Sequence, residues 1–301
     1  FDRNLLSFIE LNNELNIPLE VKQLMEVTDY ECQIVNTLSG TVHRSRFSSN
    51  ERIPLINILS QRLDKMEMRF DYDSMDNYRK LAFLNARVHL YTYYFFDLKD
   101  DRNDRHDFYD NSSDEDDETT KRKKNGIPGE DADDDRLSLS LKFGLIKLFD
   151  ACVAVINHCQ LSQNADKRFM KYLPGVYVIS IWQAAFMITK ISFSPLKQII
   201  DFQKGKNMYQ LAIYLTLRSS VMKHDIAFRF SGIMQSLWQL FDTLYLKKSL
   251  KFQVSITSRM AASVFFDCLL ILREKSGMMR FMIKKEDDED INSDVEGVDD
   301  I

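Results

Sequence analysis

Scarcity of glycine and proline is the feature that most constrains how this chain can fold. The 301 residues include only 9 glycines and 5 prolines. These two residue types mark turns and interrupt regular structure. Many short strands joined by turns would require more of them, so the sequence favours long helices. We therefore predict an all-α fold, and 45% hydrophobic residues supply a substantial core.

Apolar residues recur at helical spacing along most of the chain. In segment 137–159, for example, Leu141, Leu145 and Leu148 fall on one stripe. Segment 176–181 (VYVISI) is the one strand-like stretch, but the residues that follow it favour a buried helix. The predicted helices span 2–14, 18–39, 51–70, 78–98, 137–159, 166–191, 195–203, 206–218, 224–247 and 252–275.

One internal segment departs from this pattern because it is rich in charge and poor in apolar side chains. Residues 99–136 contain the runs SSDEDDE, KRKK and GEDADDD, and burial cannot offset the entropy of ordering them. We predict a disordered insertion that divides one helical domain into 1–98 and 137–285. The run KRKK at 121–124 resembles a nuclear import patch, although short basic runs also arise by chance.

The C-terminal residues 286–301 form an acidic tail that also carries hydrophobic residues. This composition suits a segment that is disordered alone and folds weakly onto a partner, and it equally suits a tail that only keeps the protein soluble. Without the acidic insertion and tail, the helical body is basic, although the whole chain has a net charge of −5. The spaced hydrophobic residues of the tail are Ile291, Val295, Val298 and Ile301.

The sequence lacks the usual signatures of catalysis and of metal or cofactor binding. GxSxG, Walker, HExxH and GxGxxG motifs are absent, so we predict no enzyme activity and no cofactor. The absence of a CxxC pair predicts free thiols in a reducing compartment. No apolar run reaches the roughly 20 residues of a membrane span, and no basic strip with interleaved aromatics predicts DNA contact. The cysteines are Cys32, Cys152, Cys159 and Cys268.

Basic side chains within otherwise apolar helices favour a binding site. An unpaired buried cation costs several kcal/mol, so each one needs a carboxylate or a bound anion. On the stripe that holds Met222 and Ile226, Asp225 can cap a helix or pair with Arg229. These groups either satisfy one another in a closed network or line a cavity for a small anion. The residues that we predict for such a cavity are Arg87, His89, Tyr91, Tyr94, Lys190, Arg218, Asp225 and Arg229.

Five blocks follow one another in a family-specific order, although each is low in specificity by itself. They are RIPLINILSQRLDKME (52–67), LNARVHLYTYYFFD (84–97), LPGVYVISIWQAAFMITKI (173–191), LRSSVMKHDIAFRFSGIMQSLW (217–238) and RMAASVFFDCLLILREKSG (259–277). Together they resemble the middle homology region of fungal zinc-cluster (Zn2Cys6) transcription factors. Within that family they are most similar to the regulators of leucine biosynthesis.

This resemblance implies a regulatory domain of a nuclear protein that binds DNA as a homodimer. Zinc is then expected only in an N-terminal cluster that this sequence lacks, and we expect the chain, which opens at Phe1 without a signal peptide, to be a fragment. The acidic tail is expected to activate transcription by contacting the transcription machinery. The resemblance also implies regulation by α-isopropylmalate, a hydroxylated dicarboxylate. The alternative is a helical interaction or dimerisation scaffold without a small-molecule site.

Overall fold

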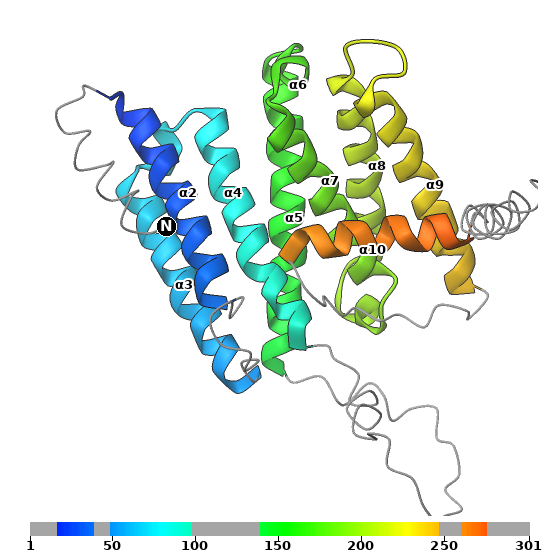
Figure 1. The fold of residues 1–301 in the computed structure, drawn as a ribbon, viewed down its shortest axis with the longest axis horizontal. Helices are drawn as coiled ribbons and strands as arrows, with labels where there is room; N and C mark the ends of the chain where they lie inside the picture. The colour runs from blue at the N-terminus through cyan, green and yellow to red at the C-terminus, as the bar shows by residue number, and fades with distance from the viewer. Residues whose placement is uncertain (1–16, 39–48, 98–138, 247–259, 276–301) are drawn as a thin grey trace, which may run out of the picture.

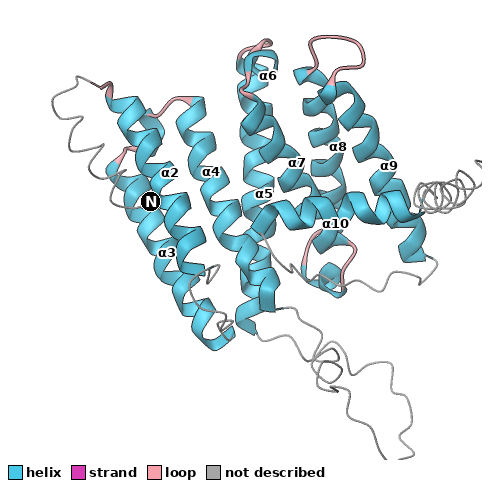
Figure 2. Cartoon of the chain, in the orientation of Figure 1, coloured by secondary structure: helices cyan, strands magenta, loops and turns pink. Residues whose placement is uncertain are grey.

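The computed structural model describes residues 17–38, 49–97, 139–246 and 260–275. Within these ranges every secondary-structure element is a helix (Figures 1 and 2), so the predicted all-α fold is confirmed. The predicted helix 2–14, the insertion and the acidic tail lie outside the described residues. The α-helices are α2 (Leu19–Leu38), α3 (Ser49–Arg69), α4 (Asn77–Thr92), α5 (Leu139–Ala165), α6 (Phe169–Tyr172), α7 (Gly175–Ser192), α8 (Phe202–Ser219), α9 (Ile226–Leu246) and α10 (Met260–Lys275), and the 3-10 helices are η1 (Tyr72–Ser74), η2 (Tyr93–Asp97) and η4 (Pro195–Ile199).

One predicted helix, 166–191, is divided in the structure. The short α6 ends at Tyr172 and α7 begins at Gly175. Leu173 precedes Pro174, and a residue before proline is pushed out of the helical region by the proline ring. Leu173 accordingly has extended backbone angles, with φ −64° and ψ 125°. The prediction of one continuous helix was therefore wrong, because it overlooked the effect of Pro174.

The helices stand side by side, and the last one crosses them. Going along the molecule, α4 packs on α5, α5 on α7, α7 on α8 and α8 on α9, while α2 and α3 cover the free side of α4. α10 runs across this row and contacts α4, α7 and α9 (Figure 1). From α4 to α9 the order of the main helices in space follows their order in the chain.

α7 is the central core helix. It is apolar and long enough to cross a membrane by length and composition alone, but 72% of its residues are buried within the protein. Its Trp182 ring stacks on Phe230 of α9 at a centroid distance of 3.9 Å, and Phe230 stacks in turn on Phe265 of α10 at 5.4 Å. The indole N–H of Trp182 donates to the Thr216 hydroxyl of α8 at 3.0 Å. One side chain therefore joins α7 to both α8 and α9.

Gly144 lets α5 approach the end of α4 closely. Its Cα faces the ring of Tyr94 in η2, and a Cβ at this position would lie well inside contact distance of three ring carbons. Tyr94 is itself buried, so its ring has little room to move away. Gly232 in α9 is the contrasting case, because a Cβ there would have no neighbour within 4 Å.

We expect Gly144→Ala to destabilise the protein by about 1–3 kcal/mol, the usual cost of overpacking a core contact. Gly232→Ala is the matched control and should stabilise α9 by up to about 1 kcal/mol, since alanine is the better helix former. Urea unfolding followed by circular dichroism measures both changes. A Gly144→Ala midpoint equal to or above that of the parent would show that the contact does not constrain α5.

Candidate functional site

Arg87, on α4, is held by two carboxylates of α3. Its guanidinium donates to Asp64 at 2.8 Å and also pairs with Glu67. Burial alone would lower the pKa of Arg87, but the two acidic neighbours raise it above its ordinary value. This predicted site residue therefore neutralises side chains of its own protein and ties α4 to α3.

His89 lies two residues later on α4 and joins three helices. Its Nδ1 lies 2.9 Å from a carboxylate oxygen of Glu31 in α2, and its Nε2 lies 3.4 Å from the Gln183 amide oxygen in α7. Burial on its own would lower the pKa of His89, but the bond to Glu31 raises it above the ordinary value. Both neighbouring oxygens can accept a hydrogen bond, so the protonated ring, which donates from both nitrogens, fits this position.

Two predicted tyrosines, Tyr91 and Tyr94, also bond to α3. The Tyr91 hydroxyl lies 2.8 Å from the Ser60 hydroxyl, and the Tyr94 hydroxyl donates to Asn57 at 3.5 Å. The structure thus places Arg87, His89, Tyr91 and Tyr94 along one helix and its extension. Their polar groups are directed at α2, α3 and α7, which favours the closed-network interpretation for this part of the predicted site.

Asp225 caps α9. Its carboxylate accepts hydrogen bonds from the backbone amides of Phe228, Val221 and Met222 at 2.8–3.1 Å. These bonds, of which the one from Phe228 has the largest effect, lower the pKa of Asp225 to about 2. The capping alternative is therefore confirmed, and the buried stripe predicted around it is wrong, because Met222 and Ile226 are each 71% exposed.

The remaining predicted cations are two exposed arginines and one buried lysine. Arg218 and Arg229 are both exposed, and the Arg229 Nε donates to the His224 carbonyl at 2.8 Å. Lys190 is only 2% exposed, near the end of α7. None of the eight predicted residues lines either of the two surface pockets described below.

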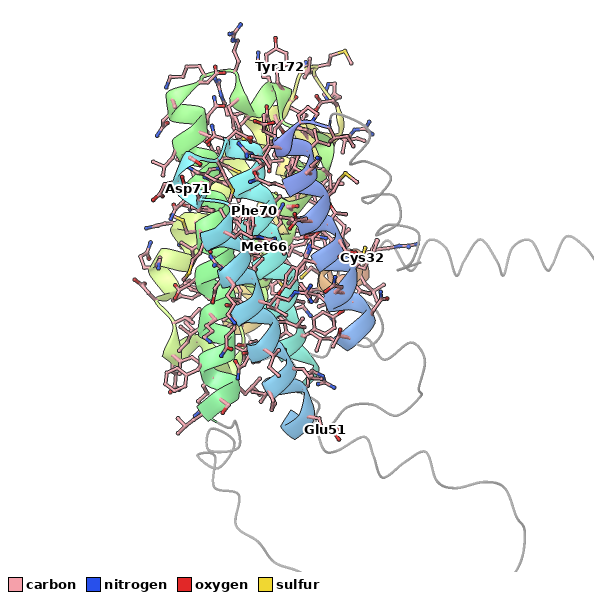
Figure 3. The ribbon with its side chains drawn as sticks, turned by 90° about the vertical axis from the view of Figure 1, so that its left-hand side faces the viewer. Cys32, Glu51, Met66, Phe70, Asp71 and Tyr172 are labelled. Carbon is pink, nitrogen blue, oxygen red and sulfur yellow. The ribbon has the colours of Figure 1, made fainter. Side chains whose placement is uncertain are left out.

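The first surface pocket is a groove between α2 and α3, which we call the α2–α3 groove. It has a volume of about 460 Å³ and carries more positive than negative side chains. The face that contains it is turned to the viewer in Figure 3, where Met66 lies between the two helices. The lining residues are Glu26, Asp29, Tyr30, Gln33, Arg62, Lys65, Met66 and Arg69.

Sequence reasoning missed the α2–α3 groove, although a signal was present. Arg62, Lys65 and Arg69 are spaced i, i+3 and i+7, which places three cations on one face of α3. A row of charges on an amphipathic helix usually indicates a solvated face. Only the position of α2 shows that this row borders a groove, so the spacing alone could not distinguish the two cases.

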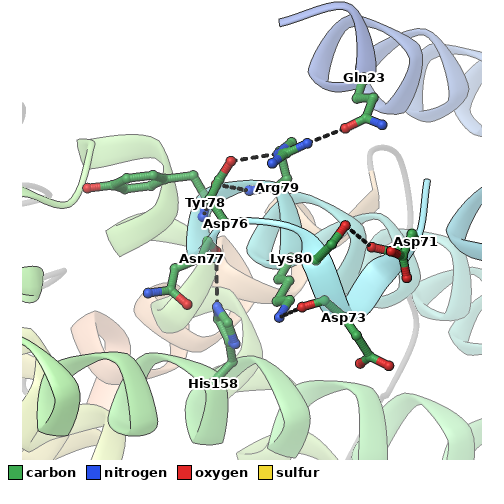
Figure 4. A network of polar contacts seen from close by, with 10 residues as sticks. Gln23, Asp71, Asp73, Asp76, Asn77, Tyr78, Arg79, Lys80 and His158 are labelled. Carbon is green, nitrogen blue, oxygen red and sulfur yellow. Dashed lines mark hydrogen bonds and ion pairs between the residues drawn. The ribbon is translucent and has the colours of Figure 1, made fainter. Parts of the chain in front are cut away.

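The second pocket is acidic and cannot suit an anion. Four of its six lining residues, Asp64, Glu67, Asp71 and Asp73, carry carboxylates. It borders a polar network at the start of α4 (Figure 4), where Asp76 accepts from the backbone amides of Tyr78 and Arg79. In the same network Lys80 donates to the Asp73 carbonyl at 3.1 Å, and His158 of α5 bonds to the Asn77 carbonyl at 3.0 Å.

Cysteine and metal chemistry contribute no site among the described residues. The four cysteines are free thiols, as predicted, and only Cys32 is exposed. Burial raises the pKa of Cys159 to about 12, so that thiol stays protonated and unreactive. Within the described ranges, no group of three or more His, Cys, Asp or Glu side chains is arranged to hold a metal ion.

Comparison with known proteins gives the chain a relative. It is 34% identical to "Regulatory protein LEU3" of Saccharomyces cerevisiae (strain ATCC 204508 / S288c) over 93% of its own length. The match spans 32% of LEU3, and because it covers nearly all of this chain, the similarity to LEU3 is not confined to one helix. No family model matches the sequence, and no solved structure matches the chain.

Because His89 contacts Glu31, we expect the unfolding free energy to depend on pH. A folded-state pKa above the unfolded value of about 6.5 stabilises the fold fully at low pH, and this contribution is lost as the pH rises through the folded pKa. His89→Gln should therefore flatten the fall in unfolding free energy between about pH 5.5 and pH 8.

His158→Gln is the control, because it should change the pH dependence of the unfolding free energy in the opposite direction. Burial lowers the pKa of His158, so its titration favours the folded state as the pH rises, and removing it should steepen the fall. Urea titrations of the parent and both variants across this pH range measure the slopes. Identical slopes for the parent and His89→Gln would contradict the assigned role of His89.

Proposed function

We propose that this chain is the regulatory region of a transcription regulator whose activity is set by a small anionic metabolite. The observation that carries this proposal is the 34% identity to Regulatory protein LEU3 over 93% of the chain. The whole protein is then nuclear, dimeric and bound to DNA through a part outside this sequence. The chain itself is proposed to act by binding and conformational change, without enzyme activity.

The best candidate for the metabolite is α-isopropylmalate. This ligand follows from the similarity to a leucine regulator together with the chemistry of the chain. A hydroxylated dicarboxylate is recognised by at least two cations and a hydrogen-bonding group next to apolar surface. The helical body offers such cations, because many of the acidic residues of the chain lie outside it, in 99–136 and 286–301.

Binding of the metabolite is proposed to expose the acidic tail 286–301. Without the metabolite, the tail is proposed to dock on one end of the helical body. This end, which we call the apical surface, consists of α6, the start of α7, the end of α8 and the start of α9 (top of Figure 1). Its exposed cations include Lys171, Arg218 and Lys223. Its exposed apolar residues are Tyr172, Val176, Ile179, Tyr214, Leu217, Val221, Met222, Ile226 and Phe228.

The tail matches the apical surface in chemistry and in reach. It contains nine acidic residues, no lysine or arginine, and spaced hydrophobic residues. α10 contacts α9, and the 21 residues of α9 span about 31 Å. The ten residues 276–285 can extend to roughly 33–36 Å, enough to bring the tail from the end of α10 to the start of α9.

The proposed mechanism is a shift between two populations, one with the tail docked and one with it released. The metabolite can favour release only by its differential affinity, and a tenfold preference for the released form is worth about 1.4 kcal/mol. A docking surface held by modest electrostatic and apolar contacts is compatible with a switch of this size.

The alternative function is a helical interaction or dimerisation scaffold without a metabolite site. It is favoured by the internal pairing of Arg87 with two carboxylates and by the capping role of Asp225. Both observations assign structural work to residues that the sequence had suggested for a ligand. A direct binding measurement separates the two functions.

We expect α-isopropylmalate to raise the thermal unfolding midpoint of the purified chain. A ligand at 100 times its Kd stabilises the native state by about 2.7 kcal/mol, which corresponds to at least about 4 °C for a chain of this size. Differential scanning fluorimetry over a concentration series measures a saturable shift. No shift at millimolar ligand, with no heat of binding in a calorimeter, would favour the scaffold.

Tail docking by charge predicts that salt exposes the tail to protease. Cleavage within 286–301 should accelerate when ionic strength rises, because screening weakens contacts between exposed charges. α-Isopropylmalate should accelerate it at low salt. Mass spectrometry of intact chain after brief Glu-C treatment follows the cleavage.

The matched variant for this experiment is Lys171→Glu with Lys223→Glu, which reverses two exposed charges on the apical surface. It should release the tail at low salt without ligand. Cleavage that is independent of salt and of these substitutions would contradict docking at this surface.

A further inference from the structure

We infer that the α2–α3 groove is a binding site for a small dianion of the dicarboxylate class. The inference deepens the proposed function and rests on it for the identity of the metabolite. It assigns the site to residues outside the set that the sequence suggested, and the central pair is Arg62 and Lys65 on α3. Four sets of observations carry it: the state of the cations, the state of the carboxylates, the floor of the groove and its size.

Of the three cations that α3 contributes to the groove, one is paired with a carboxylate and two are not. Arg69 pairs across the groove with Glu26 of α2. Arg62 and Lys65 line the same groove, and among the described residues neither is within ion-pair distance of a carboxylate. Residues three apart on a helix have Cβ atoms about 5–6 Å from each other, which suits two anionic groups of one small molecule.

The carboxylates of the groove compensate this pair of cations only in part, since Asp29 is the one acidic residue of the lining that is not paired with Arg69. Glu26 is paired with Arg69, and the Asp29 carboxylate accepts a hydrogen bond from the Gln33 amide at 2.6 Å. Three cations against two carboxylates give the lining a net charge of +1. Binding a dianion at Arg62 and Lys65 therefore needs no existing ion pair to be broken.

The floor of the groove is buried and neutral. The Tyr30 side chain is buried, and its hydroxyl donates to the Leu59 carbonyl at 2.7 Å. Burial raises the pKa of Tyr30 above its ordinary value, so the phenol adds no negative charge. Met66 beside it offers a thioether and methylenes, which can adapt their shape to a branched aliphatic group.

The dimensions also fit a small metabolite. A volume of about 460 Å³ falls within the range of roughly 300–1,000 Å³ that is typical of small-molecule sites. The groove lies between α2 and α3, and both helices are bound to α4. Glu31 of α2 contacts His89 of α4, and Asp64 of α3 pairs with Arg87 of α4. A ligand there would bear directly on the spacing of α2 and α3 and thereby on α4.

The test is isothermal titration calorimetry on the 301-residue chain at fixed ionic strength, with α-isopropylmalate as the first probe. The variant is Arg62→Gln with Lys65→Gln, which changes two exposed side chains without ion pairs in the described structure. The control is Arg168→Gln with Lys147→Gln, again one arginine and one lysine, both exposed and both outside the groove; among the described residues, its one ion contact is the exposed one between Arg168 and Asp166 at 3.9 Å. Inorganic phosphate and succinate are the second and third probes.

The groove variant should bind α-isopropylmalate at least about tenfold more weakly than the parent, because two charge-assisted contacts are lost. The control should remain within about twofold of the parent, as surface substitutions usually do. If both double variants bind like the parent, the groove assignment is overturned while the proposed function stands.

The other probes separate the site from the identity of its metabolite. Binding of succinate that is lost in the groove variant, with no binding of α-isopropylmalate, would support the groove and overturn the proposed metabolite. Loss of phosphate binding alone, with neither dicarboxylate bound, would overturn the dicarboxylate class. Absence of binding by all three probes at millimolar concentration would overturn both the groove and the metabolite-sensing function.

Discussion

The position of α4 between α2, α3 and α5 is the constraint on which the use of charge in this protein depends. α4 is a core helix that nevertheless carries Arg87 and His89, and burial without partners would make either charge costly. α3 supplies two carboxylates for the arginine, and α2 and α7 supply oxygens for the histidine. The N-terminal helices are therefore bound to the rest of the protein by polar contacts that fix their register on α4. The outer face of α3 is then left with cations that have no internal task.

The all-α class and most helix positions could be predicted because they depend on local properties. Few glycines and prolines, together with apolar residues at helical spacing, act within a few turns of chain. The failure at 166–191 was also local, since Leu173 before Pro174 cannot continue a helix. That boundary was readable in principle from the sequence.

The candidate site could not be predicted in the same way, because its charges find partners far along the chain. His89 meets Glu31 across 58 residues, and Arg87 meets Asp64 across 23. Helical periodicity identified these side chains as unusual but could not show what faced them. The prediction of a buried stripe around Asp225 was wrong for a different reason. This stripe was assigned to the core on apolar spacing, whereas Met222 and Ile226 lie where α8 turns into α9 and remain exposed.

The α2–α3 groove and the apical surface lie on different helices, so a metabolite in the first can influence a tail on the second only through the packed row between them. That row runs from α3 through α4 to α5, and from α5 directly to α8 as well as through α7. Tyr94 of η2, which follows α4 directly, packs against Gly144 of α5, and Trp182 joins α7 to α8 and α9. Tightly packed interfaces of this kind respond to a displacement by moving whole helices, because they have little free volume in which to absorb it. The same close packing that makes the helices a single body thus gives a ligand between two of them a physical route to the far end.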